Sequence, residues 1–252
     1  GGETMSKVAA LDELWNSTPS PTEIFDARRL ARLPEAARRY LTYAITPGIQ
    51  LAWAVRLRMH GAIKLKRWFP FKAEQVIRSD RGMIWRATVR MRGVPIRGFD
   101  RLLDGAGEMQ WKLLGLVPLM TVANPDITRS AAGRLGAETV WLPSRFCRED
   151  VTWTTPDSSH AHASFMVEGE RVAVQLAIDG VGRLGSLKLK RWGNPGGAEY
   201  HYVDFGGVVE SEGAFDGYTI PTRLRAGWYF GTERFESEGE FFRARIDRAD
   251  FR

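Results

Sequence analysis

The pattern of apolar and polar residues changes near residue 50. Across residues 51–59 apolar side chains occupy every second position, and the same alternation returns across residues 83–91. Side chains of a β-strand point alternately to its two faces, so both stretches predict strands with one buried face and one arginine-rich, solvated face. Trp53 and Trp85 belong to the sets that we expect to face inward.

Alternation continues almost to the end of the chain, and short turns separate the predicted strands. Further strands are expected at 95–103, 108–114, 151–155, 160–167, 171–178, 184–192, 200–205, 208–212, 218–230 and 240–246. Strands joined by short turns pair antiparallel, because parallel neighbours need crossovers of about a dozen residues or more. In the segment 64–71, Pro70 is expected to interrupt pairing. The pattern therefore predicts a mainly β (α+β) fold built on an antiparallel sheet.

One internal helix is predicted within residues 126–140. Asp126 suits the N-cap and Pro143 suits the stop. The body of this segment is rich in alanine and glycine, which a free surface helix would not favour. Small residues let another element approach closely, so we expect a helix that lies against the sheet. Either tight packing or a cavity beside the helix would explain them.

A polar line runs along the same helix at i, i+4 spacing, and it has two interpretations. Its members are Asp126, Ser130, Arg134 and Glu138. On a solvated face, Arg134 and Glu138 would form an ordinary surface pair. On a face that borders a cavity, they would meet the polar end of a ligand.

The first 48 residues are predicted to be helical. One helix would open at residues 21–23, and a second follows Pro34 with the apolar stripe Ala37, Tyr40, Leu41, Ala44 and Ile45. An amphipathic helix is stabilised mainly by docking. We therefore expect residues 1–48 to be a helical segment packed on a main domain of residues 49–252.

Charge and composition narrow the choice of partners. The chain has 252 residues and a net charge of +6, with basic residues spread along many segments. The arginine-rich strand faces contain Arg56, Arg58, Arg86, Arg90, Arg92, Arg223, Arg225, Arg243 and Arg245. Solvated faces paired with acids such as Glu240 and Asp247 would account for them. No nucleic-acid-binding motif is recognisable, so nucleic acid is not an expected partner, whereas an anionic membrane surface stays open.

Candidate chemistry is sparse. Cys147 is the only cysteine, which excludes an intrachain disulfide and a multi-cysteine zinc site. His160 and His162 stand two apart on a predicted strand, but no third metal ligand follows at a diagnostic spacing. The chain has no GxSxG, HExxH or P-loop motif. We therefore assign no catalytic residue, no metal and no cofactor.

The expected location is the cytoplasm, with attachment to the membrane periphery as an alternative. Residues 113–123 form the longest nearly apolar run, which is too short to cross a bilayer as a helix. The first fifteen residues lack a basic segment followed by an apolar core, so no signal peptide is expected. A lone cysteine agrees with a reducing compartment.

Several longer stretches resemble a bacterial family of proteins of unknown function. They are LPEAARRYL, WKLLGLVP, DITRSAAGRLGAETVWLPS, RWGNPGG, the FGG of residues 205–207 and YTIPTRLRAGWYFGTERFE. The resemblance runs from about residue 33 to the end, and we associate the family with half-barrel lipid carriers of the LolA-like (lipoprotein-carrier-like) type. It implies a strongly curved antiparallel sheet, or half-barrel, with N-terminal helices and one internal helix that covers the concave face.

These observations lead to a functional hypothesis with two alternatives. We expect a noncatalytic binding or carrier protein for an apolar or amphipathic, lipid-like small molecule. The expected lining is Arg134, Leu135, Glu138, Trp141, Trp192 and Trp228. One alternative is an enzyme in which Glu138 and a histidine such as His60 form an acid-base pair in the same cavity. The other is a peripheral membrane-associated module that uses the basic strand faces.

Overall fold

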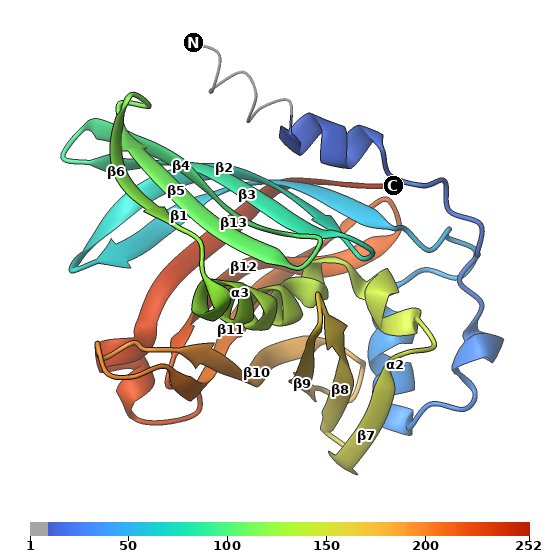
Figure 1. Cartoon of the computed structure of the whole chain (residues 1–252). Helices are drawn as coiled ribbons and strands as arrows, with labels where there is room; N and C mark the ends of the chain where they lie inside the picture. Colours follow the sequence, from blue (N-terminus) through green and yellow to red (C-terminus); the bar gives the residue numbers. More distant parts are fainter. Residues whose placement is uncertain (1–9) are drawn as a thin grey trace.

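A computed structural model describes residues 10–252 of the chain (Figure 1). Within this range thirteen strands form one curved, unclosed sheet in the order β6-β5-β4-β3-β2-β1-β13-β12-β11-β10-β9-β8-β7. The strands are β1 Ala54–Leu65, β2 Arg67–Arg78, β3 Gly82–Met91, β4 Val94–Leu103, β5 Ala106–Leu113, β6 Val117–Val122, β7 Thr152–Asp157, β8 His160–Val167, β9 Glu170–Ile178, β10 Leu184–Gly193, β11 His201–Phe215, β12 Tyr218–Trp228 and β13 Glu240–Phe251. Every neighbouring pair is antiparallel, as the short turns predicted.

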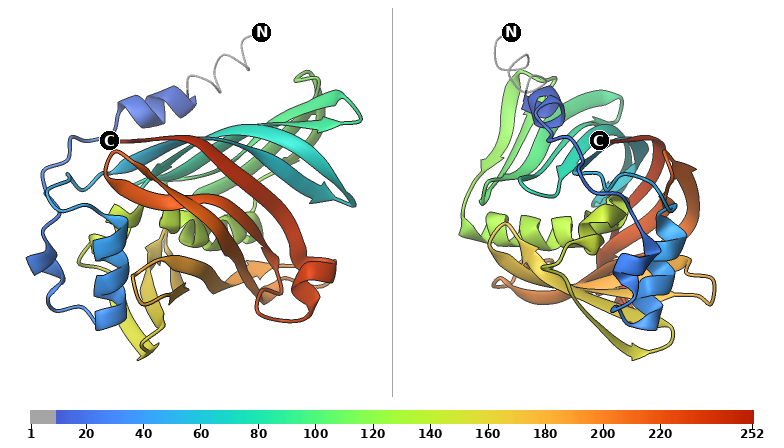
Figure 2. Two further views of the ribbon diagram at one scale, coloured as in Figure 1. Left: turned by 180° about the vertical axis from the view of Figure 1, so that it is seen from behind. Right: turned by 90° about the vertical axis from the view of Figure 1, so that its right-hand side faces the viewer.

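The first and last strands pair at the middle of the sheet. β1 lies against β13, with Val55 opposite Phe251 and Ile63 opposite Phe242. The sheet therefore consists of two wings, β1–β6 and β7–β13, which curve toward each other (Figure 2). Alternation predicted the inward face of the first wing, since Trp85 is buried and Trp53 is half-buried beneath the guanidinium of Arg148.

Helix α3 (Pro125–Glu138) connects the two edge strands, β6 and β7, and lies between the wings on the concave side (Figure 1). Its N-cap is Asn124, whose side chain accepts a hydrogen bond from the Ile127 backbone at 2.9 Å. The expected cap at Asp126 is therefore wrong, because Pro125 already occupies the first helical turn.

The expected stop of α3 at Pro143 is also too late. The helix ends at Glu138, and two short 3₁₀ segments follow it, η2 (Thr139–Trp141) and η3 (Pro143–Cys147). Pro143 opens the second of these segments. A proline is well suited to such a first turn, since it has no backbone N–H to leave unpaired.

The N-terminal part is helical in three short pieces. Residues 10–16 are helical, a 3₁₀ turn η1 covers Ala27–Leu30, and α2 covers Glu35–Ala44. The apolar stripe of α2 lies in the same core as the sheet, as docking requires. A helix opening at residues 21–23 is wrong, because Ile24 instead forms a β-bridge with Gln50. A domain boundary at residue 48 stays a prediction, and most of the segment examined for a signal peptide lies outside the described residues.

Three strand predictions need correction. Pro70 does not interrupt pairing: it lies opposite Ala62 of β1, while pairing with β3 begins only at Phe71, so the missing N–H costs no ladder bond. Strand β6 was not expected, because its residues are exposed on both faces and show no alternation. The segments 200–205 and 208–212 are one continuous strand, β11, that passes through the glycines between them.

Candidate ligand-binding cavity

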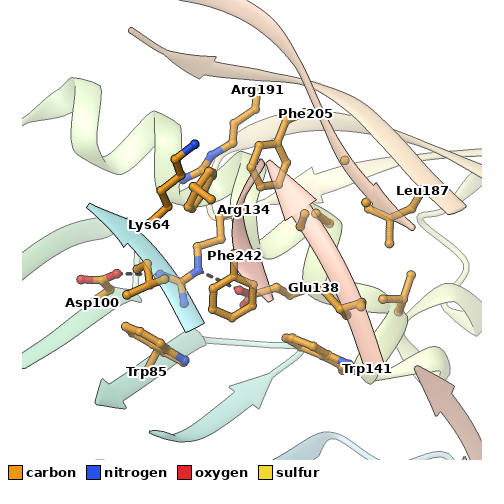
Figure 3. A pocket seen from close by; sticks show the side chains of 18 of the residues that line it. Lys64, Trp85, Asp100, Arg134, Glu138, Trp141, Leu187, Arg191, Phe205 and Phe242 are labelled. Atoms are coloured by element: carbon orange, nitrogen blue, oxygen red, sulfur yellow. Dashed lines mark hydrogen bonds and ion pairs between the residues drawn. The ribbon is translucent and has the colours of Figure 1, made fainter. Parts of the chain in front are cut away.

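A cavity of about 270 Å³ lies between α3 and the concave face of the sheet (Figure 3). Side chains from both wings reach it, and most of them are apolar. Its apolar lining includes Ile63, Trp85, Val140, Trp141, Leu187, Phe205, Leu224 and Phe242. The cavity therefore offers an apolar molecule a site that the two wings and the helix build together.

An ion cluster forms one side of this cavity. The Arg134 guanidinium lies 2.7 Å from the Asp100 carboxylate on β4 and 2.7 Å from the Glu138 carboxylate one helical turn away. The Gln75 amide donates to the second oxygen of Glu138 at 2.5 Å, and the Trp111 indole donates to Asp100 at 3.1 Å. Both carboxylates are thus held by two donors each, and Figure 3 shows the two bonds from Arg134.

The ion cluster is shielded from solvent. This rules out the interpretation in which the polar line of α3 is a solvated helix face. The side chains of Arg134 and Glu138 are only 16% and 12% exposed. Burial raises the pKa of Asp100, and the charge of Arg134 offsets only part of that rise. Burial acts to lower the pKa of Arg134, but its two carboxylate partners outweigh burial and the pKa is raised. Arg134 is therefore a fully balanced charge that holds the two acids in place.

A second arginine lines the cavity without such a partner. Arg191 of β10 is mostly buried, and its Nε donates to the Ser130 carbonyl at 2.9 Å. Its guanidinium lies over the rings of Phe205 and Trp228, at 4.6 and 4.9 Å from their centroids. Within residues 10–252 it forms no ion pair. Burial and the neighbouring charge of Arg134 lower its pKa, which shows that the site disfavours this unpaired cation.

The charges that line the cavity do not cancel. Lys64 of β1 also lines it, and this lysine has no ion-pair partner in the part of the chain that the structure describes. Lys64, Arg134 and Arg191 stand against Asp100 and Glu138, so the lining has one positive charge in excess. The buried Trp85 adds an indole N–H that finds no acceptor in residues 10–252.

The structure brings three of the six predicted site residues to the cavity. Arg134, Glu138 and Trp141 line it, and the Trp141 indole donates to the Pro221 carbonyl at 3.1 Å. Leu135 is 7% exposed and faces the core on the other side of α3. Any role of these residues in binding stays a prediction.

The two remaining tryptophans lie near the cavity but do not line it. The indole of Trp192 donates to the Asp126 carboxylate at 2.9 Å, and its ring lies beneath Arg129. Trp228 stands edge-on to Phe205 at 5.2 Å, behind the cavity wall. Its ring contacts residues that line the cavity, Phe205, Phe241 and Arg191, from behind.

The histidine of the enzyme alternative is on the wrong side of the sheet. His60 pairs with Asp247 at 2.8 Å and lines a hollow on the convex face, whereas Glu138 lies on the concave side. None of the four histidines lines the cavity. In residues 10–252 no three side chains of His, Cys, Asp or Glu gather as a metal site.

The convex hollow is larger, about 960 Å³, and ten of the sixteen residues that line it are polar or charged. Glu74 pairs there with Arg56 at 2.9 Å and with Arg86 at 3.5 Å. This is the solvated, paired face that the alternating arginines predicted. It does not match an apolar ligand.

A family model described as a family of unknown function (DUF6920) matches residues 31–251. The chain belongs to this family. The match agrees with the resemblance that the motifs indicated from about residue 33 onward. No curated protein matches the chain. Among the residues described, no helix is long and apolar enough to cross a membrane.

Three solved structures are similar to this DUF6920 member at low sequence identity. One is a putative outer membrane lipoprotein-sorting protein domain from Vibrio parahaemolyticus, with 10% identity, a TM-score of 0.42, and coverage of 90% of this chain and 94% of that one. A LolA superfamily protein from Nitrosomonas europaea has 9% identity, a TM-score of 0.42, and coverage of 86% and 92%. A DUF1329 family protein from Desulfovibrio piger has 9% identity, a TM-score of 0.37, and coverage of 86% and 90%.

Sequence reasoning missed Asp100, Arg191 and Lys64 in this DUF6920 cavity. A signal for Arg191 exists, because Leu187, Leu189 and Arg191 alternate along β10 and share its inward face. An arginine at the end of an inward apolar series indicates a cation that faces the interior. Asp100 gives the same signal on β4, where it alternates with the buried Leu102.

Proposed function

We propose that this protein is a noncatalytic carrier that binds a single-chain amphipathic molecule with an anionic head group in the cavity between α3 and the sheet. The observation that carries the proposal is Arg191, a mostly buried cation with no carboxylate partner in residues 10–252, at the edge of an apolar cavity. The apolar lining would hold the tail of the ligand, and Arg191 would hold its head.

An unpaired cation in such a place has an energetic cost that an anionic ligand removes. A charge taken out of water is disfavoured unless it is paired and hydrogen-bonded. Guanidinium groups keep their proton in proteins, so the site cannot avoid this cost by neutralising Arg191. A carboxylate or phosphate that reached Arg191 would form a charge-assisted hydrogen bond and restore the balance of charge.

The size of the cavity supports a ligand with one chain. Pockets for small molecules span roughly 300–1,000 Å³, and this cavity of about 270 Å³ lies just below that range. Trp85, Phe205 and Phe242 supply large apolar surfaces for a flexible chain. A two-chain lipid would need the wings to open.

The occupied carboxylates support binding over acid-base chemistry. Glu138 is engaged by Arg134 and Gln75, and Asp100 by Arg134 and Trp111. An acid-base group needs a free oxygen within reach of the substrate, and these four hydrogen bonds occupy the oxygens that face the cluster.

The lone cysteine supports a cytoplasmic location as part of the same proposal.

The test compares an acid with its neutral ester. We would titrate the protein with parinaric acid and with its methyl ester, which share one fluorescent chain. The acid should bind about tenfold tighter or more, since a hydrogen bond to a charged group contributes about 1.5–3 kcal/mol. Arg191→Met should abolish this preference and leave binding of the ester unchanged.

Arg38→Met is the matched control, because Arg38 is exposed on α2 and does not line the cavity. It should keep the preference for the acid. Equal binding of acid and ester by the unaltered protein would contradict the proposal, and so would equal losses in the two variants.

A further inference from the structure

Three hairpin turns project from the same end of the first wing, away from α2 (Figures 1 and 2). They join β1 to β2, β3 to β4 and β5 to β6. A hydrogen bond joins the second and third of these hairpins, because the Leu114 backbone N–H donates to the Pro95 carbonyl at 2.9 Å. We call residues 63–72, 90–97 and 110–120 together the hairpin-tip surface.

Exposed apolar side chains concentrate on the hairpin-tip surface. Of eleven large apolar side chains that are exposed within residues 10–252, seven belong to it. They are Leu65, Val94, Leu114, Leu116, Val117, Leu119 and Met120. Leu116, near the turn between β5 and β6, is 75% exposed. Such a cluster marks a contact surface, because single exposed apolar residues are normally scattered.

The same surface concentrates positive charge. Its three segments contain eight lysines and arginines and no aspartate or glutamate, while the rest of the chain has 28 basic and 30 acidic residues. The eight are Lys64, Lys66, Arg67, Lys72, Arg90, Arg92, Arg97 and Lys112. The structure therefore gathers into one patch the positive excess that looked evenly spread along the sequence.

These cations are available to an outside partner. Apart from Lys112, none of the eight forms an ion pair within residues 10–252, and all of those seven except Lys64, which is half-buried, are exposed. By contrast, Arg225 and Arg243 on the convex face of the second wing both pair with Glu240. The charges of the hairpin-tip surface are thus unbalanced within the described protein.

Two backbone amides at the apex already have partners inside the protein. The turn between β5 and β6 is closed by a hydrogen bond from the Leu116 amide to the Leu113 carbonyl, at 2.9 Å. The Leu114 amide is satisfied by Pro95. Backbone groups that are bonded internally avoid the cost of several kcal/mol that unsatisfied groups incur in lipid.

We propose that the hairpin-tip surface docks on an anionic lipid bilayer, with Leu116 and its apolar neighbours in the outer acyl region and the surrounding cations on the lipid phosphates. Apolar side chains ringed by lysine and arginine match the two layers of such a surface. A second copy of the chain fits less well, because it would bring eight like charges against eight others. Nucleic acid would use the cations but leave the leucines uncovered.

Docking goes beyond the proposed carrier function and does not depend on it. One link between them rests on that function: Lys64 and Leu65 belong to the hairpin-tip surface and also line the cavity. A docked protein would therefore hold the edge of its cavity at the bilayer, where a ligand with an acyl chain can enter or leave.

The experiment is co-sedimentation with phosphatidylcholine vesicles and with vesicles that also contain phosphatidylglycerol. At an ionic strength of about 0.1 M the protein should bind the mixed vesicles and not the neutral ones, and binding should weaken at about 1 M. Leu116→Ser should weaken it about tenfold, the loss expected for one buried leucine. Arg67→Glu with Arg90→Glu should weaken it at least about 25-fold, because each basic residue at such a surface contributes about fivefold.

Matched controls lie elsewhere on the molecule. Val181→Ser changes a 69% exposed apolar residue in the turn between β9 and β10, and Arg32→Glu with Arg38→Glu reverses two exposed charges near α2. Both should bind like the unaltered protein. Arg191→Met should also bind normally, which separates docking from the carrier function.

Three outcomes would overturn docking. Absence of binding to the mixed vesicles at low salt is one. Full binding by the tip variants, or equal losses in the controls, is another. The third is self-association in sedimentation velocity that Leu116→Ser abolishes, without any binding to vesicles, which would assign the hairpin-tip surface to a second copy of the chain.

Discussion

The two sides of α3 meet the sheet in opposite ways. On one side Gly133 and Gly136 lie against strands: a Cβ added at Gly133 would lie 2.7 Å from Cγ of Arg191, and one at Gly136 would lie 3.1 Å from Cγ2 of Val172. On the other side Arg134, Ala137 and Glu138 border the cavity. The helix is therefore packed tightly on its glycine side and leaves space on its charged side.

This difference explains a composition that was ambiguous in the sequence. The glycines of α3 serve close packing against β9 and β10, and the cavity lies about a quarter turn away, beside the polar line. Small residues alone could not separate these cases, because they suit both a tight contact and an opening. The long polar side chains of Arg134 and Glu138 indicate the cavity better, since such side chains need room and hydrogen-bond partners.

The largest effect should come from Arg134→Met. Its removal leaves the carboxylates of Asp100 and Glu138 enclosed without their cation, which should destabilise the protein by about 3–5 kcal/mol in urea unfolding. The deficit should shrink as the pH falls, because burial already raises the pKa of Asp100 and loss of Arg134 raises it further, so the folded state then binds more protons.

Arg129→Met is the control for this prediction. Arg129 belongs to the same helix, but its pair with Glu170 is 3.4 Å long and its side chain is 41% exposed. Its loss should change stability by about 1 kcal/mol or less. Equal losses of stability in the two variants would mean that Arg134 is as open to solvent as Arg129, and would contradict the enclosed ion cluster.

Gly136→Leu should have the next largest effect. Leucine cannot fit beside Val172, so overpacking should destabilise the protein by about 1–3 kcal/mol, even though leucine favours a helix more than glycine does. The melting temperature should fall by about 2–4 °C for each kcal/mol. An unchanged melting temperature would show that this side of the helix is not tightly packed.

Ala137→Leu, at the next residue, should impair binding and leave stability nearly unchanged. Ala137 lines the cavity, so a larger side chain has room and stability should stay within about 1 kcal/mol. Binding of parinaric acid and of its ester should both fall, because the side chain occupies their space. Loss of stability without a change in binding would show that Ala137 faces a packed core and that the ligand does not bind beside it.

The smallest effect concerns Cys147, which ends η3, the second 3₁₀ segment after α3. Burial raises the pKa of its thiol to about 12, so the thiolate that reacts with alkylating reagents is scarce at neutral pH. Iodoacetamide should therefore label the folded protein more slowly than the protein in urea. Rapid labelling of the folded protein would show that this segment opens.

The fold was predictable from the sequence to a large extent, because burial of one sheet face imposes a period of two. Alternation identified most strands of both wings, but it missed β2, where Pro70 was expected to interrupt pairing, and β6, where neither face is buried. The N-cap of α3 was missed because Asp126 and Asn124 are both good caps, and only the position of Pro125 separates them.

The site was predictable only where its residues share one element. Arg134 and Glu138 stand one turn apart on α3, so their spacing predicted a pair. Asp100 and Arg191 come from strands in different wings, and no local pattern relates them to the helix. The hairpin-tip surface was missed for the same reason, since three short segments must come together before their charges form a patch.

The most direct test of the central claim is a crystal structure of the protein with an ω-brominated fatty acid. Anomalous scattering from bromine is expected inside the cavity, with the carboxylate within hydrogen-bonding distance of the Arg191 guanidinium. Bromine found only at the hairpin-tip surface, or a carboxylate held elsewhere with Arg191 still unpaired, would contradict it.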